Sequence, residues 1–339
     1  MGIEKALKIL SEKGNLSDQL AYESMNEMMS GEASEVSMAA FLTALRIKGE
    51  TIDEIYGTSK VMREKALKVQ CVSDNLVDTC GTGGDGAHTF NISTTAMFVA
   101  ACNGIKIAKH GNRSITSKSG AADVLEALGA EITSSPEEIR ECIDQVGIGF
   151  MFAPHFHASM KYAMPVRKAL GFKTIFNILG PLSNPAGAKR QLLGVYDRNL
   201  VRVVAEVLKK HEAVHALVVH GSDGLDEITL TGPTYAAELK DGMVTEYIIH
   251  PEDYGFALCT SQDLAGGTPQ ENAQITLYIL SGVQSPKADT VILNAGAAIY
   301  IGGKANSLQQ GIEMARMTLA EQSALPMLQK FIAKTRKNI

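Results

Sequence analysis

The strongest constraint on the fold is a glycine-rich segment that follows a short apolar run. Leu76–Cys80 has the character of a strand, and Gly81–Gly86 contains four glycines in six residues. Hydroxyl and amide side chains are dense over Thr89–Thr95, and an apolar helical run begins at Ala96. Glycines let backbone N–H groups approach an anion, and a helix start adds the positive end of its dipole. The pattern predicts a strand, a phosphate-binding loop and a helix. A plain turn that needs positive φ angles is the alternative.

Composition restricts the kinds of partner. The chain has 339 residues, enough for one large or two ordinary domains, and 45% of them are hydrophobic, enough for a sizeable core. The net charge is −5, from 32 Lys and Arg against 37 Asp and Glu. This balance argues against general binding to nucleic acid or to an anionic membrane. An anionic substrate would therefore need local positive groups or a divalent cation.

The cysteines and the apolar runs indicate a cytoplasmic protein. The five cysteines form no Cys-x-x-Cys pair and are odd in number, as expected of reduced, mostly buried thiols. The start of the sequence, MGIEKALKIL, lacks the apolar region of a signal peptide. Since no apolar run reaches about 18 residues, no membrane-spanning segment is expected.

The chain is expected to divide into two domains. The first part is all-helical in pattern, and Thr51–Glu54 is a capping box that opens a helix running to about Lys68. The pattern then alternates between strands and helices, which is typical of an α/β fold with a mostly parallel central sheet and flanking helices. We expect a small helical domain over residues 1–70, joined by helices from about 160–185, and a larger α/β domain over residues 71–339.

The apolar periodicity predicts individual elements. Strands are expected over Leu76–Cys80, Ile105–Lys109, Gly149–Ala153, Leu192–Asp197 and Val214–His220. Helices are expected over Thr94–Asn103, Ser119–Leu128, Ser135–Val146 and Arg198–His211. A hairpin is expected over Pro233–His250, with its turn at Asp241-Gly242. Three helices are expected to close the chain, over Pro269–Leu280, over Asp289–Ile301 and from Ser307 onward.

Positive charge gathers after the second expected strand. Lys109-His110-Gly111-Asn112-Arg113-Ser114 is followed by Ile115–Gly120, which adds further hydroxyls and a lysine. Cationic side chains, hydroxyls and backbone donors at the start of a helix suit phosphate oxygens. A solvated basic loop is the alternative. In a doubly wound sheet this segment and the glycine segment both leave the carboxyl ends of their strands, where ligands bind.

Three acidic residues, Asp223, Asp226 and Glu227, follow the strand that is expected to end at His220. Neighbouring carboxylates repel one another unless a cation or water lies between them. Carboxylate oxygens together with a phosphate suit Mg²⁺, which keeps several waters and needs few protein ligands. Alone, this loop would be interpreted as a solvent-exposed turn, but beside two phosphate loops it predicts a metal site.

Weaker signals lie in the middle of the chain. His155 and His157 have no cysteine or carboxylate nearby in sequence, so packing or hydrogen bonding is expected of them. Arg167 has the fork that suits a carboxylate, and a surface arginine is an equal alternative. Asn177–Pro185 contains Gly-Pro and Asn-Pro pairs that mark turns, so we interpret it as a structural link between domains.

Together these motifs closely resemble the anthranilate phosphoribosyltransferase family, of the nucleoside phosphorylase-like class of phosphoribosyltransferases. The resemblance extends from the helical start to Ile301 and rests on Gly81–Gly86, Lys109–Arg113, Asn177–Pro185 and Leu225-Asp226-Glu227. It implies a small helical domain, a larger α/β domain and a homodimer formed through the helical domains. It also implies transfer of phosphoribose from phosphoribosyl pyrophosphate (PRPP) to the amino group of anthranilate in tryptophan biosynthesis, with Mg²⁺ present and pyrophosphate released.

The resemblance also implies a role for individual residues. Those that would contact PRPP are Gly81, Gly84, Asp85, Thr89, Asn91, Ile92, Ser93, Thr94, Lys109, His110, Gly111, Asn112, Arg113, Ser114, Ile115, Thr116, Ser117 and Ala121. Those that would contact anthranilate are Gly81, Asn112 and Arg167. Those that would hold two Mg²⁺ ions are Ser93, Asp226 and Glu227. The candidate catalytic residues are Lys109, His110, Asn112 and Arg167. The family usually has serine where this chain has Ala121, so one PRPP contact would differ.

The implied chemistry agrees with these residue types. Pyrophosphate leaves with much negative charge, which Mg²⁺ and Lys109 can stabilise. An aromatic amine is already neutral at pH 7, so it needs positioning more than deprotonation before it attacks. His110 is a candidate proton acceptor, and a structural loop histidine is an equal alternative.

Two other functions remain open from the sequence. A pyrimidine nucleoside phosphorylase would share the fold and a glycine loop but would not need Mg²⁺, which Asp226 and Glu227 argue against. A non-enzymatic or nucleic-acid-binding relative would favour a basic surface and a decayed metal motif, whereas this chain is acidic and has the motif. We therefore expect small-molecule substrates and neither a nucleic-acid nor a membrane partner.

Overall fold

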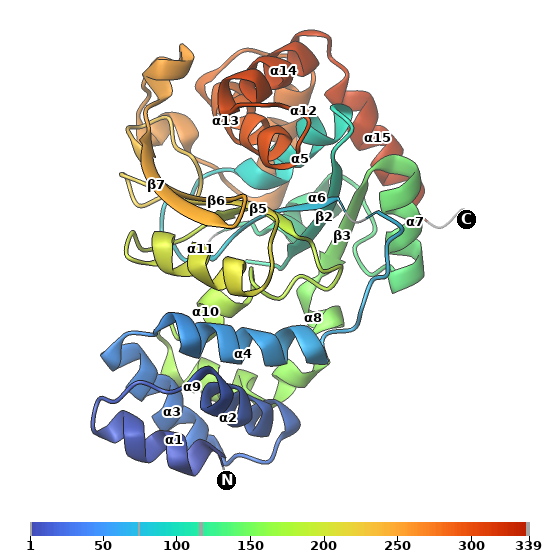
Figure 1. Cartoon of the computed structure of the whole chain (residues 1–339). Coiled ribbons are helices and arrows are strands. Elements are labelled where there is room, and N and C mark those ends of the chain that lie inside the picture. Colours follow the sequence, from blue (N-terminus) through green and yellow to red (C-terminus); the bar gives the residue numbers. More distant parts are fainter. Residues whose placement is uncertain (1, 74, 115–117, 337–339) are drawn as a thin grey trace.

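The first four helices form a bundle at one end of the molecule, as a computed structural model of residues 2–73, 75–114 and 118–336 shows (Figure 1). They are α1 (Gly2–Ser11), α2 (Asp18–Ser30), α3 (Glu35–Lys48) and α4 (Ile52–Lys65). The expected capping box opens α4, because the side chains of Thr51 and Glu54 each accept a hydrogen bond from the other residue's backbone N–H. The helix ends at Lys65, short of Lys68, since the backbone becomes extended at Ala66.

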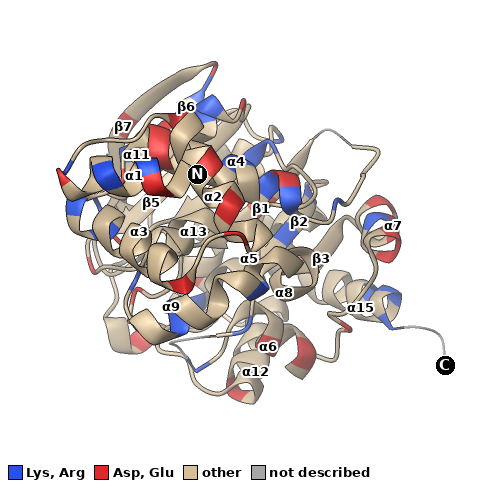
Figure 2. Ribbon diagram, turned by 90° about the horizontal axis from the view of Figure 1, so that it is seen from below, with Lys and Arg blue, Asp and Glu red and all other residues tan. Residues whose placement is uncertain are grey.

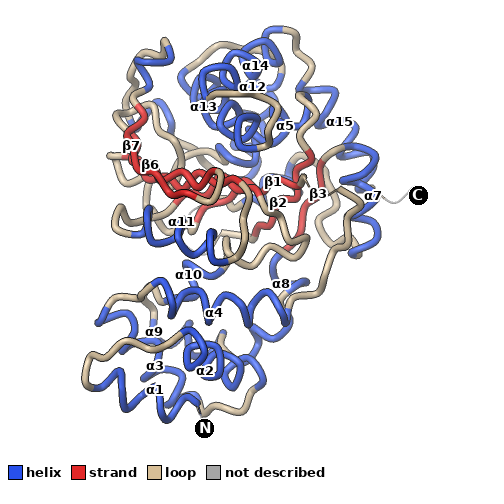
Figure 3. Tube along the Cα trace, viewed as in Figure 1, coloured by secondary structure: helices blue, strands red, loops and turns tan. Residues whose placement is uncertain are grey.

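The rest of the chain is built on a seven-stranded sheet with the order β3-β2-β1-β4-β5-β6-β7 (Figure 3). The strands are β1 (Leu76–Gly81), β2 (Lys106–Gly111), β3 (Ile148–Phe152), β4 (Arg190–Gly194), β5 (His215–Gly221), β6 (Thr234–Lys240) and β7 (Met243–Ile249). The first five are parallel, and the last two form the expected antiparallel hairpin. Its turn residues, Asp241 and Gly242, both have positive φ angles. The predicted α/β fold with a mostly parallel sheet is confirmed.

Helices cover both faces of the sheet (Figure 1). One face lies under α5 (Ile92–Cys102), α6 (Ala121–Ala127), α12 (Pro269–Leu280), α13 (Pro286–Ile301), α14 (Leu308–Ala320) and α15 (Ala324–Thr335). The other face lies against α11 (Leu200–Lys210), with α7 (Pro136–Val146) and α8 (Ala153–Phe156) beside β2 and β3. Short helices complete the fold: η1 (Ala158–Tyr162), α9 (Met164–Leu170), α10 (Ile175–Leu179), η2 (Pro251–Tyr254) and η3 (Ser261–Leu264).

The two faces of the sheet belong to different apolar cores. In β5, Leu217 and Val219 pack beneath α5 and α13, whereas Ala216 and Val218 pack on the opposite side, as alternation along a strand requires. The second core continues through α11 into the helical bundle, where it includes Met25, and it also takes in Phe176 of α10. The bundle is therefore joined to the sheet by continuous apolar packing.

The expected boundaries of β4 and of the last helices are among those that differ from the structure. We expected a strand over Leu192–Asp197, but β4 spans Arg190–Gly194 because it pairs there with both β1 and β5. We expected one helix from Ser307 onward, but the described residues form two, because the chain turns between α14 and α15 at Gln322, which has a positive φ angle. Among the described residues, no helix has the length and apolar character that crossing a membrane requires.

Candidate active site

Three loops meet where the parallel strands end. The glycine loop follows β1, the basic segment follows β2 and the acidic loop follows β5, so all three leave the same edge of the sheet. Over the molecule as a whole, acidic and basic segments are interspersed in the view of Figure 2. The charged residues that could form a binding site are therefore those of these three loops.

A pair of glycines lets the acidic loop lie directly on the sheet. Gly81 and Gly194 are register partners at the ends of β1 and β4. A Cβ atom on Gly81 would lie 2.3 Å from Asp226 Oδ2, and one on Gly194 would lie 1.5 Å from the Asp226 carbonyl oxygen. The glycine loop also holds this acid, since the Gly83 N–H donates to Asp226 Oδ2 at 2.7 Å. Gly194 was not singled out from the sequence, because a lone glycine at the end of a strand carries no signal of what approaches it.

The acidic loop meets a buried lysine. Lys109 is only 2% exposed, and its Nζ donates to the Thr79 carbonyl and to Ser93 Oγ, the latter at 3.2 Å. Glu227 accepts a hydrogen bond from the Ser93 N–H at 3.1 Å. Ser93 thus bridges the lysine and the carboxylate from the first turn of α5.

The carboxylates of this cluster are incompletely neutralised. Burial raises the pKa of Glu227 to about 7, even though Lys109 and Ser93 favour its charged form. Burial, together with the neighbouring Asp85 and Glu227, raises the pKa of Asp226 well above its ordinary value. Among the described residues, no three His, Cys, Asp or Glu side chains form a metal-binding group by themselves. A cation here would need oxygen ligands from water or substrate as well.

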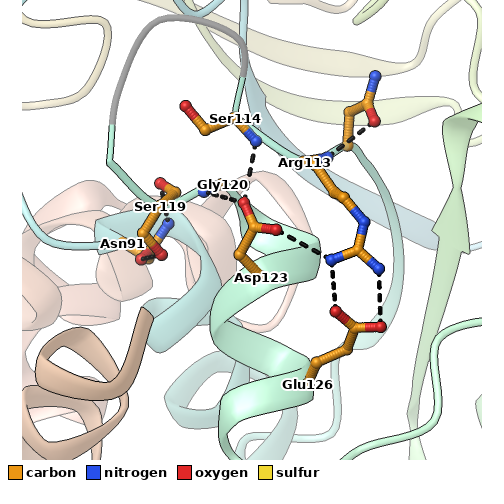
Figure 4. Close-up of polar contacts among 8 residues, drawn as sticks. Asn91, Arg113, Ser114, Ser119, Gly120, Asp123 and Glu126 are labelled. Carbon is orange, nitrogen blue, oxygen red and sulfur yellow. Dashed lines mark hydrogen bonds and ion pairs between the residues drawn. The ribbon is translucent and has the colours of Figure 1, made fainter. Parts of the chain in front are cut away.

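The basic segment after β2 is tied to its surroundings by side chains (Figure 4). Asn91, at the start of α5, donates to the Ser119 carbonyl at 3.2 Å and accepts from Ser119 Oγ at 3.2 Å. Asp123 accepts from the N–H groups of Ser114 and Gly120, and Arg113 pairs with Asp123. The predicted PRPP residues Ile115, Thr116 and Ser117 lie outside the described residues.

Comparison with known proteins identifies the family. Residues 4–66 match the helical bundle domain of a glycosyl transferase family, and residues 73–325 match its a/b domain. An anthranilate phosphoribosyltransferase of Acetivibrio thermocellus is 50% identical over 333 residues, which cover 98% of this chain and 96% of the relative. This chain belongs to the anthranilate phosphoribosyltransferase family.

Solved structures of family members have the same fold. The anthranilate phosphoribosyltransferase of Thermus thermophilus matches with a TM-score of 0.93 and 41% identity, over 98% of this chain and 99% of that one. The enzyme of Saccharomyces cerevisiae, in complex with PRPP and Mg, matches with a TM-score of 0.89 and 27% identity, over 98% and 97%. The helical bundle and the α/β part of this chain are therefore arranged as in other anthranilate phosphoribosyltransferases.

Two candidate catalytic residues of the anthranilate phosphoribosyltransferase motif lie side by side but face opposite ways. Lys109 faces the acidic loop, whereas the ring of His110 packs against His157 with 5.0 Å between centroids. Burial, followed by the neighbouring His157, lowers the pKa of His110 to about 3. His110 is thus neutral at pH 7, and its placement favours a structural histidine over a proton acceptor. His157 has the packing role expected of it.

Arg167 is a half-buried cation without a carboxylate partner among the residues that the structure describes. Its guanidinium lies over the ring of Phe176, 5.1 Å from the centroid, with Met164 Sδ 3.9 Å from Nη1. Burial lowers its pKa. An anionic group would supply the counter-charge that these neighbours lack, which suits the role that the anthranilate phosphoribosyltransferase motif implies.

The remaining candidates line the glycine loop or its continuation. Gly84 has a positive φ angle, and Asp85 accepts a hydrogen bond from the Ala87 N–H. Thr89 forms a bridge with Ala265, and the side chains of Ile92 and Thr94 are buried in α5. Two more candidates come together after β2, since a Cβ on Gly111 would lie 3.2 Å from that of Ala121.

One residue at the glycine loop was missed from the sequence. Lys173 Cε lies 3.0 Å from where a Cβ on Gly84 would be, and its Nζ lies 4.0 Å from the centroid of the Tyr196 ring. Lys173 is a single lysine between Phe172 and Thr174 and belongs to no motif. Only the packing of the segment before α10 against the glycine loop reveals it.

Asn184 gives the Asn177–Pro185 segment its structural role. Its amide donates to Asp78 Oδ2 and to the Ala108 carbonyl, both at 2.8 Å, and Asp78 is fully buried in β1. We expect Asn184→Ala to lower the free energy of unfolding by about 1–3 kcal/mol, because a buried carboxylate and a carbonyl lose a donor. Urea unfolding measures this. Asn306→Ala, at an exposed asparagine, should stay within about 0.5 kcal/mol of the unmodified protein, and an equal effect of both would contradict the role of Asn184.

Proposed function

We propose that this protein transfers phosphoribose from PRPP to the amino group of anthranilate, giving N-(5-phosphoribosyl)anthranilate and pyrophosphate in tryptophan biosynthesis. The observation that carries the proposal is the joining of the glycine loop, Lys109 and the Asp226-Glu227 pair at one edge of the sheet. A phosphate-binding loop beside incompletely neutralised carboxylates suits a substrate that brings phosphates and a cation together. The 50% identical relative with this activity in its name supports the same reaction.

Mg²⁺ fits the donor set at this site. Ser93, Asp226 and Glu227 offer hydroxyl and carboxylate oxygens, the ligands that Mg²⁺ prefers, and the raised pKa values of the two acids mark negative charge that lacks a counter-ion. We propose that these residues hold two Mg²⁺ ions when PRPP is bound. The ions would neutralise charge on the departing pyrophosphate. The yeast relative in complex with PRPP and Mg supports this assignment.

The chain's own residues would act mainly by positioning and by charge. The glycine loop, Lys109–Asn112 and Ser114 would hold the phosphates, and Lys109 would stabilise the charge on the leaving group. Asn112 and Arg167 would orient anthranilate, so that its neutral amino group faces the reacting sugar carbon. Since burial lowers the pKa of His110 to about 3, its ring is a weak proton acceptor, and no proton transfer is assigned to it.

We place a homodimer interface on the helical bundle. Val36 and Ile47 lie about three turns apart on the same side of α3 and are 80% and 77% exposed. Two such apolar residues on one helix face are typical of a surface that another chain covers. Sedimentation of the purified protein should give twice the mass of one chain. The described cysteines are all free thiols, in line with a reducing cytoplasm.

The loss of anthranilate fluorescence on addition of PRPP and Mg²⁺ tests the proposed reaction. We expect turnover that needs both substrates and stops when a chelator removes the metal. Absence of turnover with PRPP, or phosphate-dependent cleavage of a pyrimidine nucleoside without metal, would overturn the proposal.

Arg167→Ala separates the two substrates. We expect KM for anthranilate to rise about 10- to 150-fold, because a charge-assisted bond to a carboxylate contributes about 1.5–3 kcal/mol, while KM for PRPP stays nearly constant. Steady-state kinetics with each substrate varied in turn measures both constants. Arg202→Ala is the matched control, since Arg202 is an exposed arginine paired with Glu246. Equal changes in both KM values would refute the assignment of Arg167.

A further inference from the structure

We propose that Arg113 and Asp123 are positioning residues, which fix the described ends of the segment after β2, Asn112–Ser114 and Ser119–Ala121, in the form that binds the phosphates of PRPP. Asp123 holds the two ends of this segment together, and Arg113 orients Asp123 without touching a phosphate itself. The proposal rests on the proposed function, because it assumes PRPP as the ligand.

Asp123 connects points that are distant along the segment. Its Oδ2 accepts hydrogen bonds from the Ser114 N–H at 3.0 Å and from the Gly120 N–H at 2.8 Å, so one carboxylate oxygen joins both ends (Figure 4). The side chain is 16% exposed, which keeps water from replacing these bonds easily. Losing the carboxylate would release both ends at once.

Backbone packing shows that the ends are closely joined. A Cβ on Gly120 would lie 2.4 Å from the Ser114 nitrogen and 2.7 Å from the Asn112 carbonyl oxygen. The Ala122 N–H donates to the same carbonyl at 3.2 Å. Glycine is therefore required at position 120, where the two ends of the segment pass close to each other, and Asp123 adds the polar contacts that keep these ends in place.

Arg113 has its charged groups committed to carboxylates. Nη1 donates to Asp123 Oδ1 at 3.0 Å and also to Glu126, and Nη2 donates to Glu126 Oε1 at 2.8 Å. The guanidinium also lies 5.5 Å from the centroid of the Phe152 ring. A direct phosphate contact would require this fork to leave two acids that it already pairs with. The arrangement instead fits a residue that acts through Asp123.

The Arg113 ion pairs are too exposed to contribute much to global stability. Arg113 and Glu126 are 45% and 40% exposed, and exposed ion pairs contribute little to folding. The consequence of replacing Arg113 should therefore appear in the binding of PRPP rather than in the melting temperature. This expectation distinguishes a positioning role from a merely structural one.

A double-mutant cycle tests the proposal. We expect Asp123→Ala and Arg113→Met each to raise KM for PRPP about tenfold, with KM for anthranilate nearly unchanged and, for Arg113→Met, a nearly unchanged melting temperature as well. If Arg113 acts through Asp123, the double variant should be no worse than the more impaired single variant. If Arg113 binds a phosphate directly, the two effects should multiply to about 100-fold, which would overturn the proposal.

Two controls and one binding measurement complete the test. Glu126→Gln leaves Asp123 in place and should raise KM for PRPP less than about threefold. Glu141→Gln, on α7, removes a comparable exposed ion pair with Lys334 and should have no effect on KM for PRPP. Calorimetry then measures binding of PRPP with Mg²⁺. An unmodified protein that fails to bind PRPP overturns the proposed function and this inference with it. An unmodified protein that binds, together with an Asp123→Ala variant that binds equally well, overturns this inference alone.

Discussion

Glu227→Gln is expected to lower kcat/KM by about 10²-fold or more while the protein stays folded. The carboxylate accepts from the Ser93 N–H and lies in a cluster with the buried Lys109, where its pKa is raised to about 7. Replacing it by an amide of the same shape removes a ligand charge from the proposed metal site, and such a loss costs several kcal/mol of transition-state stabilisation. The fluorescence assay at increasing Mg²⁺ concentrations measures the effect.

Asp223→Asn is the control within the same loop. Asp223 accepts from the hydroxyls of Thr229 and Thr231 and from the Leu225 N–H, so it shapes the loop without facing the glycine segment. We expect its kcat/KM to stay within about threefold of the unmodified protein, because asparagine retains one acceptor oxygen. Near-normal activity of Glu227→Gln at saturating Mg²⁺ would remove the metal role of Glu227.

Gly194→Ala is expected to lower the free energy of unfolding by more than about 4 kcal/mol, or to prevent folding altogether. The added Cβ would lie 1.5 Å from the Asp226 carbonyl oxygen, and Gly194 cannot move aside because β4 pairs on both sides there, with Gly81 and Val219. Any folded fraction must displace the acidic loop and should therefore be inactive. Urea unfolding and activity per folded molecule measure these two effects.

Gly180→Ala supplies the steric control for that experiment. Gly180 has helical backbone angles, and a Cβ there would meet nothing within 4 Å. Its free energy of unfolding should change by less than about 1 kcal/mol. If Gly194→Ala were equally harmless, the acidic loop could not rest on the ends of β1 and β4 as the structure has it.

The sequence predicts which loops form the site but not how they touch. Parallel strands place their carboxyl ends at one edge, so the glycine, basic and acidic segments could be expected to meet. The contact of Asp226 with Gly194 could not, because it depends on the exact residue at which β4 ends. That strand end was itself predicted wrongly, since the apolar run continues past Gly194 into Val195.

The direction of neighbouring side chains was equally hard to anticipate. Lys109 and His110 are adjacent in one motif, and only their places in β2 show that one faces the acidic loop while the other packs against His157. Arg113 was expected to contact PRPP, and its pairing with two acids ten and thirteen residues further along the chain was not anticipated. Those two acids lie close together because they are about one turn apart on α6, and no local motif predicts that they pair with Arg113.

The apolar core that the helical bundle shares with α11 and one face of the sheet makes the chain a single cooperative unit. Met25 and Phe41 of the bundle belong to the same core as Val204 of α11 and Val218 of β5. Cutting the chain between residues 66 and 73, where the two family models meet, would leave both pieces with a large uncovered apolar surface. We therefore expect the two parts to unfold together in one transition. A substrate that binds to the α/β part should therefore also stabilise α9, the helix that contains Arg167.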